Sequence, residues 1–121
     1  MVTVIARMYV KDEKDQTRVV AALKSLAGQV QAEEPDTWMY VVHDALDEGS
    51  IPPPALGEIV FVEAYKDHAA FVAHVTGKPF LAFMAEFGPL LVQQLPPNKG
   101  GYIQVDALER IGGFVRPRAA A

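Results

Sequence analysis

Three side chains suited to proton transfer, Glu63, Tyr65 and His74, lie close together in the sequence. Carboxylates and imidazoles are common general bases in enzymes, and a phenol hydroxyl can donate a hydrogen bond to a substrate oxygen. Glu63 and Tyr65 belong to the segment Glu58–Tyr65, whose β-branched and aromatic residues predict a strand. Because side chains alternate along a strand, both point toward the same apolar interior. Burying a charged group there is costly unless it is paired, so a carboxylate at this position indicates a specific structural or functional role.

A short helix is predicted to bring His74 to the same interior. Asp67 is a good N-cap for the segment His68–Val75, and His74 lies on its apolar stripe. Two interpretations are open. In the first, Glu63 is a carboxylate with a raised pKa, His74 is a general base and Tyr65 binds or protonates a substrate oxygen. In the second, the same groups are structural, and His74 is hydrogen-bonded to Glu63 or to a backbone carbonyl.

Arg7 and Trp38 are two further candidates for substrate binding. Arg7 interrupts an otherwise apolar strand, where it could hold an anionic substrate or an enolate, or form a salt bridge at a dimer interface. Trp38 shares a predicted strand face with Tyr40, and could either stack on a planar ligand or belong to the core. The sequence leaves both alternatives open for each residue.

The periodicity of apolar residues predicts the elements that hold these side chains. A long helix begins after Asp12 or Asp15 and ends before Pro35, and consecutive prolines keep residues 44–57 as a loop. Strands are expected at residues 2–10, 37–43, 58–65 and 102–108, with two more helices at 68–75 and from Pro79 to about residue 87. The order β-α-β-β-α-α-β predicts an α+β fold, a ferredoxin-like antiparallel sheet with helices on one face. This domain takes residues 1–110, and residues 111–121 form a C-terminal tail.

Composition narrows the classes of function. The chain has 121 residues, 50% of them hydrophobic, which is enough for one domain and leaves apolar surface for a partner subunit. Its net charge of −4 argues against a general nucleic-acid binder. The absence of cysteine excludes disulfides and thiolate catalysis. The first apolar stretch is too short for a signal or membrane span, so a cytoplasmic protein with no membrane partner is expected.

No metal or cofactor site is predicted. The three histidines lack a metal-ligand spacing, and no acidic cluster accompanies them. The chain contains neither a glycine-rich phosphate loop nor a serine nucleophile elbow. It is also too short for a dinucleotide-binding domain.

The segment around Glu63 resembles the antibiotic biosynthesis monooxygenase family. The resemblance lies in Glu63 and Tyr65 at the end of the third strand, Ala69 and His74 on the helix that follows, and the turn at residues 32–37. Phe80 and Phe83 on the next helix also fit, and the similarity covers roughly residues 1–93. It implies a two-fold homodimer, the dimeric α+β barrel, in which the second subunit covers the bare face of the sheet.

The resemblance also implies a reaction. The oxygenases of this family act without metal or flavin on electron-rich phenols, anthrones or quinols, so the ligand is a small aromatic or hydrophobic molecule. A base removes a proton, the substrate reduces dioxygen, and a peroxide intermediate collapses to a quinone. Carried onto this chain, Glu63 or His74 is the base and Tyr65 donates to the oxyanion. The residues that wall the cavity are Ala6, Phe61, Phe83 and Met84.

Two other functions remain alternatives to a monooxygenase. The first is an isomerase, or another proton-transfer enzyme, that acts on a small carbonyl metabolite; it needs the same base but no dioxygen. The second is a non-catalytic dimer that binds hydrophobic metabolites. A pocket lined by phenylalanine, methionine and alanine discriminates little by hydrogen bonding, so the sequence does not name the substrate.

Overall fold

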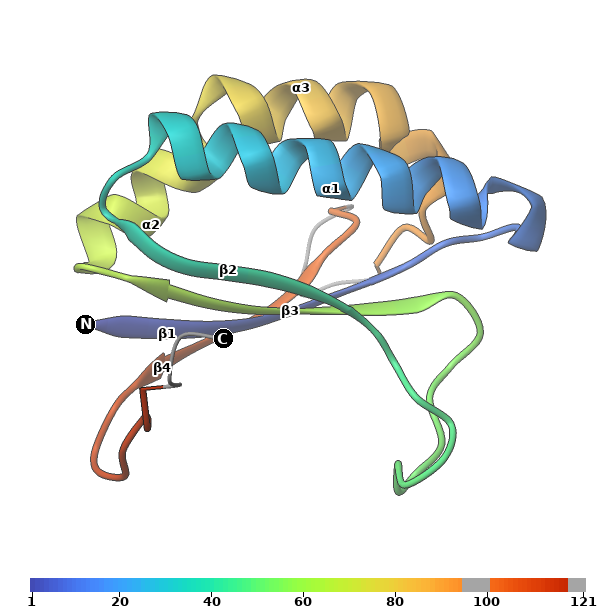
Figure 1. Ribbon diagram of the computed structural model, residues 1–121. Coiled ribbons are helices and arrows are strands. Elements are labelled where there is room, and N and C mark those ends of the chain that lie inside the picture. Colours follow the sequence, from blue (N-terminus) through green and yellow to red (C-terminus); the bar gives the residue numbers. More distant parts are fainter. Residues whose placement is uncertain (95–100, 118–121) are drawn as a thin grey trace.

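The computed structural model describes residues 1–94 and 101–117. Within this part of the chain, four strands and three α-helices follow the predicted order (Figure 1). The strands are β1 (Val2–Tyr9), β2 (Thr37–Asp44), β3 (Glu58–Tyr65) and β4 (Gln104–Glu109). The helices are α1 (Gln16–Glu33), α2 (His68–Val75) and α3 (Lys78–Phe87), with 3-10 turns η1 (Glu13–Asp15) and η2 (Gly88–Leu90).

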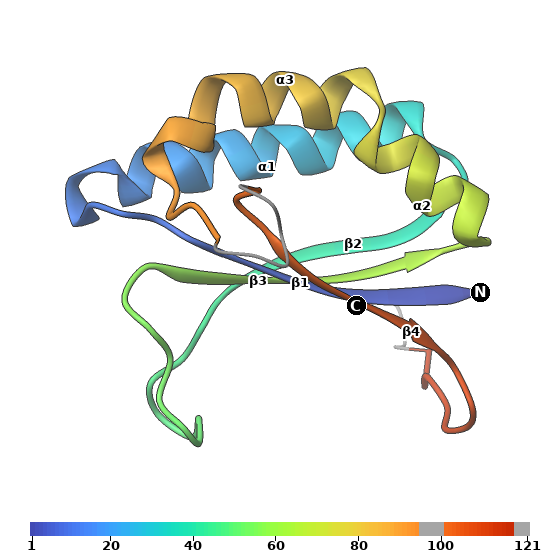
Figure 2. The same cartoon turned by 180° about the vertical axis from the view of Figure 1, so that it is seen from behind.

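The four strands form one antiparallel sheet in the order β2-β3-β1-β4. All three helices lie on one face of this sheet (Figures 1 and 2). The predicted ferredoxin-like α+β class is confirmed. The sheet is not closed within the single chain, so the closed barrel depends on a second copy and stays a prediction.

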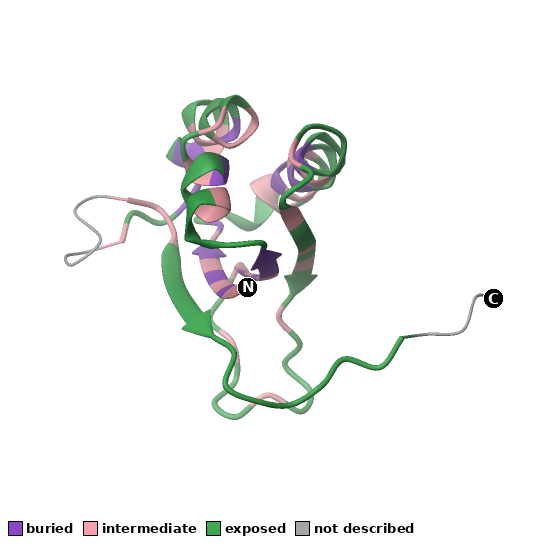
Figure 3. Cartoon of the chain, turned by 90° about the vertical axis from the view of Figure 1, so that its left-hand side faces the viewer, coloured by how far each residue is buried: buried purple, intermediate pink, exposed green. Residues whose placement is uncertain are grey.

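The core lies between the sheet and the helices, where Figure 3 shows the buried residues. Helix α1 buries one side chain per turn or so along a single stripe, as the apolar spacing predicts. Alternate residues of β1 and β3 point to the same side, because strand side chains alternate between faces. The buried residues that these three elements contribute to the core are Val4, Ala6, Met8, Val19, Leu23, Leu26, Val30, Ile59, Phe61 and Tyr65.

Two boundaries show how local chemistry places the elements. Asp67 accepts a hydrogen bond from the backbone N–H of Ala70 at 2.9 Å, which confirms its predicted role as the N-cap of α2. The last strand begins at Gln104, two residues later than predicted. Tyr102 precedes the strand, and its ring packs against Gly88, where an added Cβ would lie 3.0 Å from the tyrosine ring.

Two apolar segments project on the side of the sheet opposite the helices (Figures 1 and 2). One is the loop between β2 and β3, in which Leu46, Ile51 and Leu56 are exposed. The other is the tail, described as far as residue 117, in which Ile111 and Phe114 are exposed. The tail therefore does not pack on the body of its own chain. None of the helices described is long and apolar enough to cross a membrane.

Candidate active site

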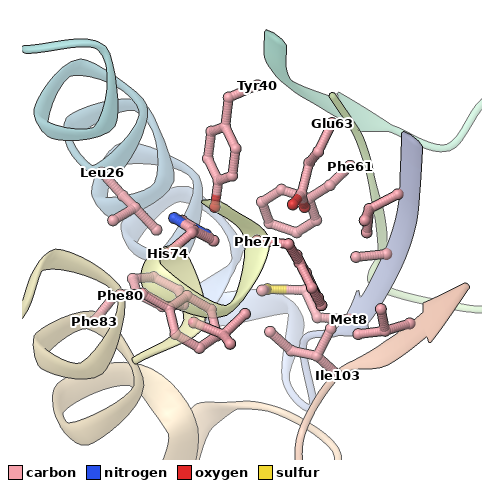
Figure 4. A pocket seen from close by; sticks show the side chains of 14 residues that line it. Met8, Leu26, Tyr40, Phe61, Glu63, Phe71, His74, Phe80, Phe83 and Ile103 are labelled. Carbon is pink, nitrogen blue, oxygen red and sulfur yellow. The ribbon is translucent and has the colours of Figure 1, made fainter. Parts of the chain in front are cut away.

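A cavity of about 50 Å³ lies between the sheet and the helices. Its wall is mostly apolar, and three polar side chains interrupt it: Tyr40 from β2, Glu63 from β3 and His74 from α2 (Figure 4). Engineered cavities that accept benzene measure about 150 Å³, so an aromatic ring enters here only if the lining residues part. The apolar lining includes Ala6, Met8, Phe61, Phe80, Phe83 and Ile103.

Glu63 is a buried carboxyl group, with 4% of its surface exposed. Its Oε1 accepts a hydrogen bond from the hydroxyl of Tyr65 at 2.5 Å. The two residues are two positions apart on β3, so strand alternation places them on one face, as the sequence predicts. Burial raises the pKa of Glu63 to about 7, although the bond from Tyr65 lowers it, and the charge of Glu34 adds to the rise.

His74 is also buried, with 2% of its surface exposed, and its partner is Glu34. The His74 Nδ1 atom lies 2.8 Å from Glu34 Oε1. Glu34 is the C-cap residue that follows α1, and Thr37, at the start of β2, donates to the same Oε1 at 3.3 Å. A carboxylate only accepts hydrogen bonds, so Nδ1 must be the donor and Nε2 of the neutral ring carries the lone pair.

The pairing between His74 and Glu63 that the structural interpretation of the sequence offers is wrong, since each of them has a different partner. Glu63 is held by Tyr65, and His74 is held by Glu34. Forty positions of sequence separate Glu34 from His74, so no local spacing connects them. The available signal was the turn at residues 32–37, which carries part of the family resemblance and contains Glu34.

The predicted substrate-binding residues divide into two groups. Ala6, Phe61 and Phe83 line the cavity together with Glu63 and His74, whereas Arg7, Trp38 and Met84 do not line it. Tyr65 is fully buried beside the cavity and reaches it only through Glu63.

Each of the residues outside the cavity has a structural reason for its place. Arg7 alternates with Ala6 on β1 and so points to the opposite face of the sheet, where it lies 3.5 Å from Asp106. Trp38 sits at an irregularity of β2, beside the far end of α1, and 58% of its surface is exposed. Met84 packs against the core from α3.

The arrangement is chemically suited to moving a proton in a water-poor space. His74 has one ring nitrogen held by a carboxylate, and no hydrogen bond to Nε2 occurs within residues 1–94 and 101–117. Glu63, with a pKa near neutrality, can accept or return a proton at ordinary pH. In the same part of the chain, no group of three or more histidine, aspartate or glutamate side chains could hold a metal ion.

The antiparallel ferredoxin-like fold agrees with the comparison of the sequence with protein families. Residues 1–86 match the model of the family described as antibiotic biosynthesis monooxygenase. The chain belongs to this family. No curated protein matches it.

Solved structures with the same fold come from several bacteria. A candidate antibiotic biosynthesis monooxygenase from Deinococcus radiodurans aligns with a TM-score of 0.72 and 13% identity, over 98% of this chain and 100% of the other. A second candidate antibiotic biosynthesis monooxygenase, from Caulobacter crescentus CB15, aligns with a TM-score of 0.72 and 20% identity, over 92% of this chain and 90% of the other. Rv0793 from Mycobacterium tuberculosis aligns with a TM-score of 0.70 and 21% identity, over 93% of this chain and 96% of the other. At these identities the likeness supports the fold.

Proposed function

We propose that this protein is a monooxygenase that oxidises an electron-rich aromatic molecule, such as a quinol, an anthrone or another phenol, with no cofactor. The observation that carries the proposal is the buried His74–Glu34 pair on an apolar cavity that also exposes a carboxyl group of raised pKa. The family membership supports a monooxygenase-like activity. The substrate class and the chemistry below are part of the proposal.

In this proposal His74 is the general base. Its Nε2 removes a proton from the substrate, and Glu34 holds the ring orientation and stabilises the imidazolium that forms. The resulting substrate anion gives one electron to dioxygen, and the two radicals combine into a peroxide. Loss of water then leaves the carbonyl product, so that one oxygen atom enters the substrate and the other enters water. Glu63 supplies and recovers the protons of the peroxide step.

Dioxygen uptake with a panel of quinols and anthrones tests the proposal. His74→Ala removes the base, and we expect turnover to fall by roughly 10² to 10⁴, the usual contribution of a positioned proton-transfer group. His68→Ala is the matched control, because His68 is an exposed histidine in the first turn of the same helix. Full activity of a folded His74→Ala variant would contradict the assignment of the base.

An isomerase, or another proton-transfer enzyme for a small carbonyl metabolite, is the second candidate. It is favoured by the presence of two proton-transfer groups, His74 and Glu63, on one cavity. Turnover that persists without dioxygen would select this candidate. Binding of aromatic ligands without turnover under any condition would instead select a non-catalytic binder of hydrophobic metabolites.

We also propose that the protein works as a homodimer whose sheets pack face to face. The supporting observation is an apolar patch, here called the outer patch, on the face of the sheet opposite the helices. Its members lie half-buried or exposed on four neighbouring strands and are Ile5, Met39, Val41, Val62 and Leu108. The apolar tail and the β2–β3 loop project on the same side and would dock on the second copy (Figure 1). Sedimentation equilibrium at micromolar concentration tests this assembly, and a stable monomer would contradict it.

A further inference from the structure

Two tyrosines lie near the cavity, and their hydroxyl groups differ in what they can do. The hydroxyl of Tyr65 already donates to Glu63 at 2.5 Å, and Tyr65 does not line the cavity. Tyr40 lines the cavity, and no residue in the described part of the chain accepts a hydrogen bond from its hydroxyl. Tyr40 is therefore the phenol that is able to donate to a ligand.

The position of Tyr40 is fixed by its neighbours. It pairs with Glu63 across β2 and β3, so the two side chains stand side by side on the inner face of the sheet. Its ring packs edge-on to His74 at 5.0 Å and tilted against Phe61 at 5.8 Å. Figure 4 shows the ring entering the cavity between His74 and Glu63. A ligand oxygen that reaches His74 thus also lies near the Tyr40 hydroxyl.

The charges around the cavity favour the neutral form of this hydroxyl. Burial raises the pKa of Tyr40 above its ordinary value, and the carboxyl groups of Glu63 and Glu34 raise it further. The hydroxyl therefore keeps its proton at neutral pH and remains a donor. A ligand that carries a negative charge would meet Glu63 in the cavity wall, with Glu34 behind His74.

No lysine or arginine is among the residues that line the cavity. The arginine that the sequence offered as an anion holder, Arg7, lies on the outer face of the sheet beside Asp106 and Glu58. An anionic ligand buried here would have no counter-ion, and an unpaired buried charge is strongly unfavourable. An uncharged ligand avoids this cost.

We infer that Tyr40 is a substrate-binding residue, which donates a hydrogen bond to the substrate oxygen, and that the site selects uncharged hydroxyaromatic molecules over aromatic acids. The inference rests on the proposed function for the meaning of "substrate", and it deepens that function. When the substrate O–H bond breaks, the proton passes to His74 Nε2 and the electron pair stays on the oxygen. The bond from Tyr40 then stabilises the developing oxyanion.

Ligand binding, measured by calorimetry without any turnover, tests the inference. The probes are single-ring molecules, which require the smallest opening of the cavity lining: phenol, its apolar isostere toluene, and benzoate, all at neutral pH. We expect Tyr40→Phe to weaken phenol binding roughly tenfold, the usual worth of one hydrogen bond, while toluene binding stays within about twofold. The matched control is Tyr9→Phe, which removes a hydroxyl on the outer face and should leave both affinities unchanged.

The wild-type protein provides a second measurement that needs no variant. We expect phenol to bind roughly tenfold more tightly than benzoate, because only benzoate brings a negative charge into a cavity that no lysine or arginine lines. Equal affinity for phenol and benzoate would overturn the inference, as would the absence of phenol binding. Equal losses of phenol and toluene affinity in Tyr40→Phe would remove Tyr40 from ligand recognition. Because no step requires dioxygen, phenol selection through Tyr40 can hold even if the monooxygenase proposal fails.

Discussion

The two faces of the sheet are built from the same strands, yet they differ in what covers them. On the inner face, β1 and β3 present Val4, Ala6 and Phe61, which the helices bury. On the outer face, Ile5 and Val62, each one position away on the same strands, remain half-buried and belong to the outer patch. The helices of the chain suffice for only one face. The difference teaches that strand alternation gives each face its composition, and that the helices of the chain cover one face and leave the other bare.

The polar groups of the two faces differ in the same way. On the inner face, burial raises the pKa of Glu63 to about 7; the hydrogen bond from Tyr65 opposes this rise, and the charge of Glu34 adds to it. On the outer face, Arg7 and Asp106 form an ion pair at 3.5 Å in contact with solvent. Exposed pairs of this kind contribute only about 0–1 kcal/mol. Burial, more than the identity of the groups, therefore decides which face can do chemistry.

The largest effect is expected from a substitution in the outer patch that weakens the proposed dimer. Val41→Asp places a carboxylate in the outer patch, and burying it unpaired at an apolar interface should weaken the proposed dimer by about a hundredfold or more. Val72→Asp is the matched control, because Val72 lies on α2, on the helix side, and both valines are 43% exposed. Analytical ultracentrifugation of both variants measures the effect. Equal dissociation constants for the two variants would contradict an interface at the outer patch.

The next effect concerns the inner face, where the ionisation of Glu63 makes the stability of the protein depend on pH. The folded pKa of Glu63, about 7, lies above the ordinary value of 4.5, so between these values the folded state holds a proton that the unfolded state has released. Its stabilising contribution is complete below pH 4.5 and is lost as the pH rises through about 7. Glu63→Gln removes this titration and keeps the acceptor for Tyr65.

Chemical denaturation of both proteins across this pH range measures the difference. A pKa difference of one unit corresponds to about 1.4 kcal/mol. The unfolding free energy of Glu63→Gln minus that of the wild type should therefore increase by on the order of 3 kcal/mol from acid to neutral pH. Because other groups titrate alike in the two proteins, the difference isolates Glu63. Parallel stability curves would show that Glu63 ionises at its ordinary pH and would weaken its role as a proton carrier.

The smallest effect compares one hydroxyl on each face. Tyr65→Phe removes the donor to buried Glu63 and should lower the unfolding free energy by about 1–3 kcal/mol. Tyr9→Phe removes a bond of 2.8 Å to the exposed side chain of Gln104, and the loss should stay below about 1 kcal/mol. Thermal or urea unfolding of the two variants gives the ratio. A larger loss for Tyr9→Phe than for Tyr65→Phe would contradict this comparison of the two hydroxyl groups.

The sequence by itself determined the fold class and which residues of the strand Glu58–Tyr65 share a face. Alternation along Glu58–Tyr65 placed Glu63 and Tyr65 together, and the capped segment after Asp67 placed His74 over the sheet. These relations are local, since a strand repeats every two residues and a helix about every 3.6. The family resemblance, which also rests on short local motifs, led to the family that residues 1–86 match.

The tertiary structure alone decided the partners of these side chains. It joined His74 to Glu34 across forty positions, placed Tyr40 beside Glu63 through the pairing of β2 with β3, and turned Arg7 away from the cavity. It also placed Trp38 at the edge of the sheet, at the irregularity of β2. Such relations depend on how helices and strands pack against one another, and hydrogen bonds between distant residues leave no periodic trace in a single sequence. The acid–base character of the site follows from that packing, because burial and a neighbouring carboxyl group, both set by the fold, shift the pKa of Glu63.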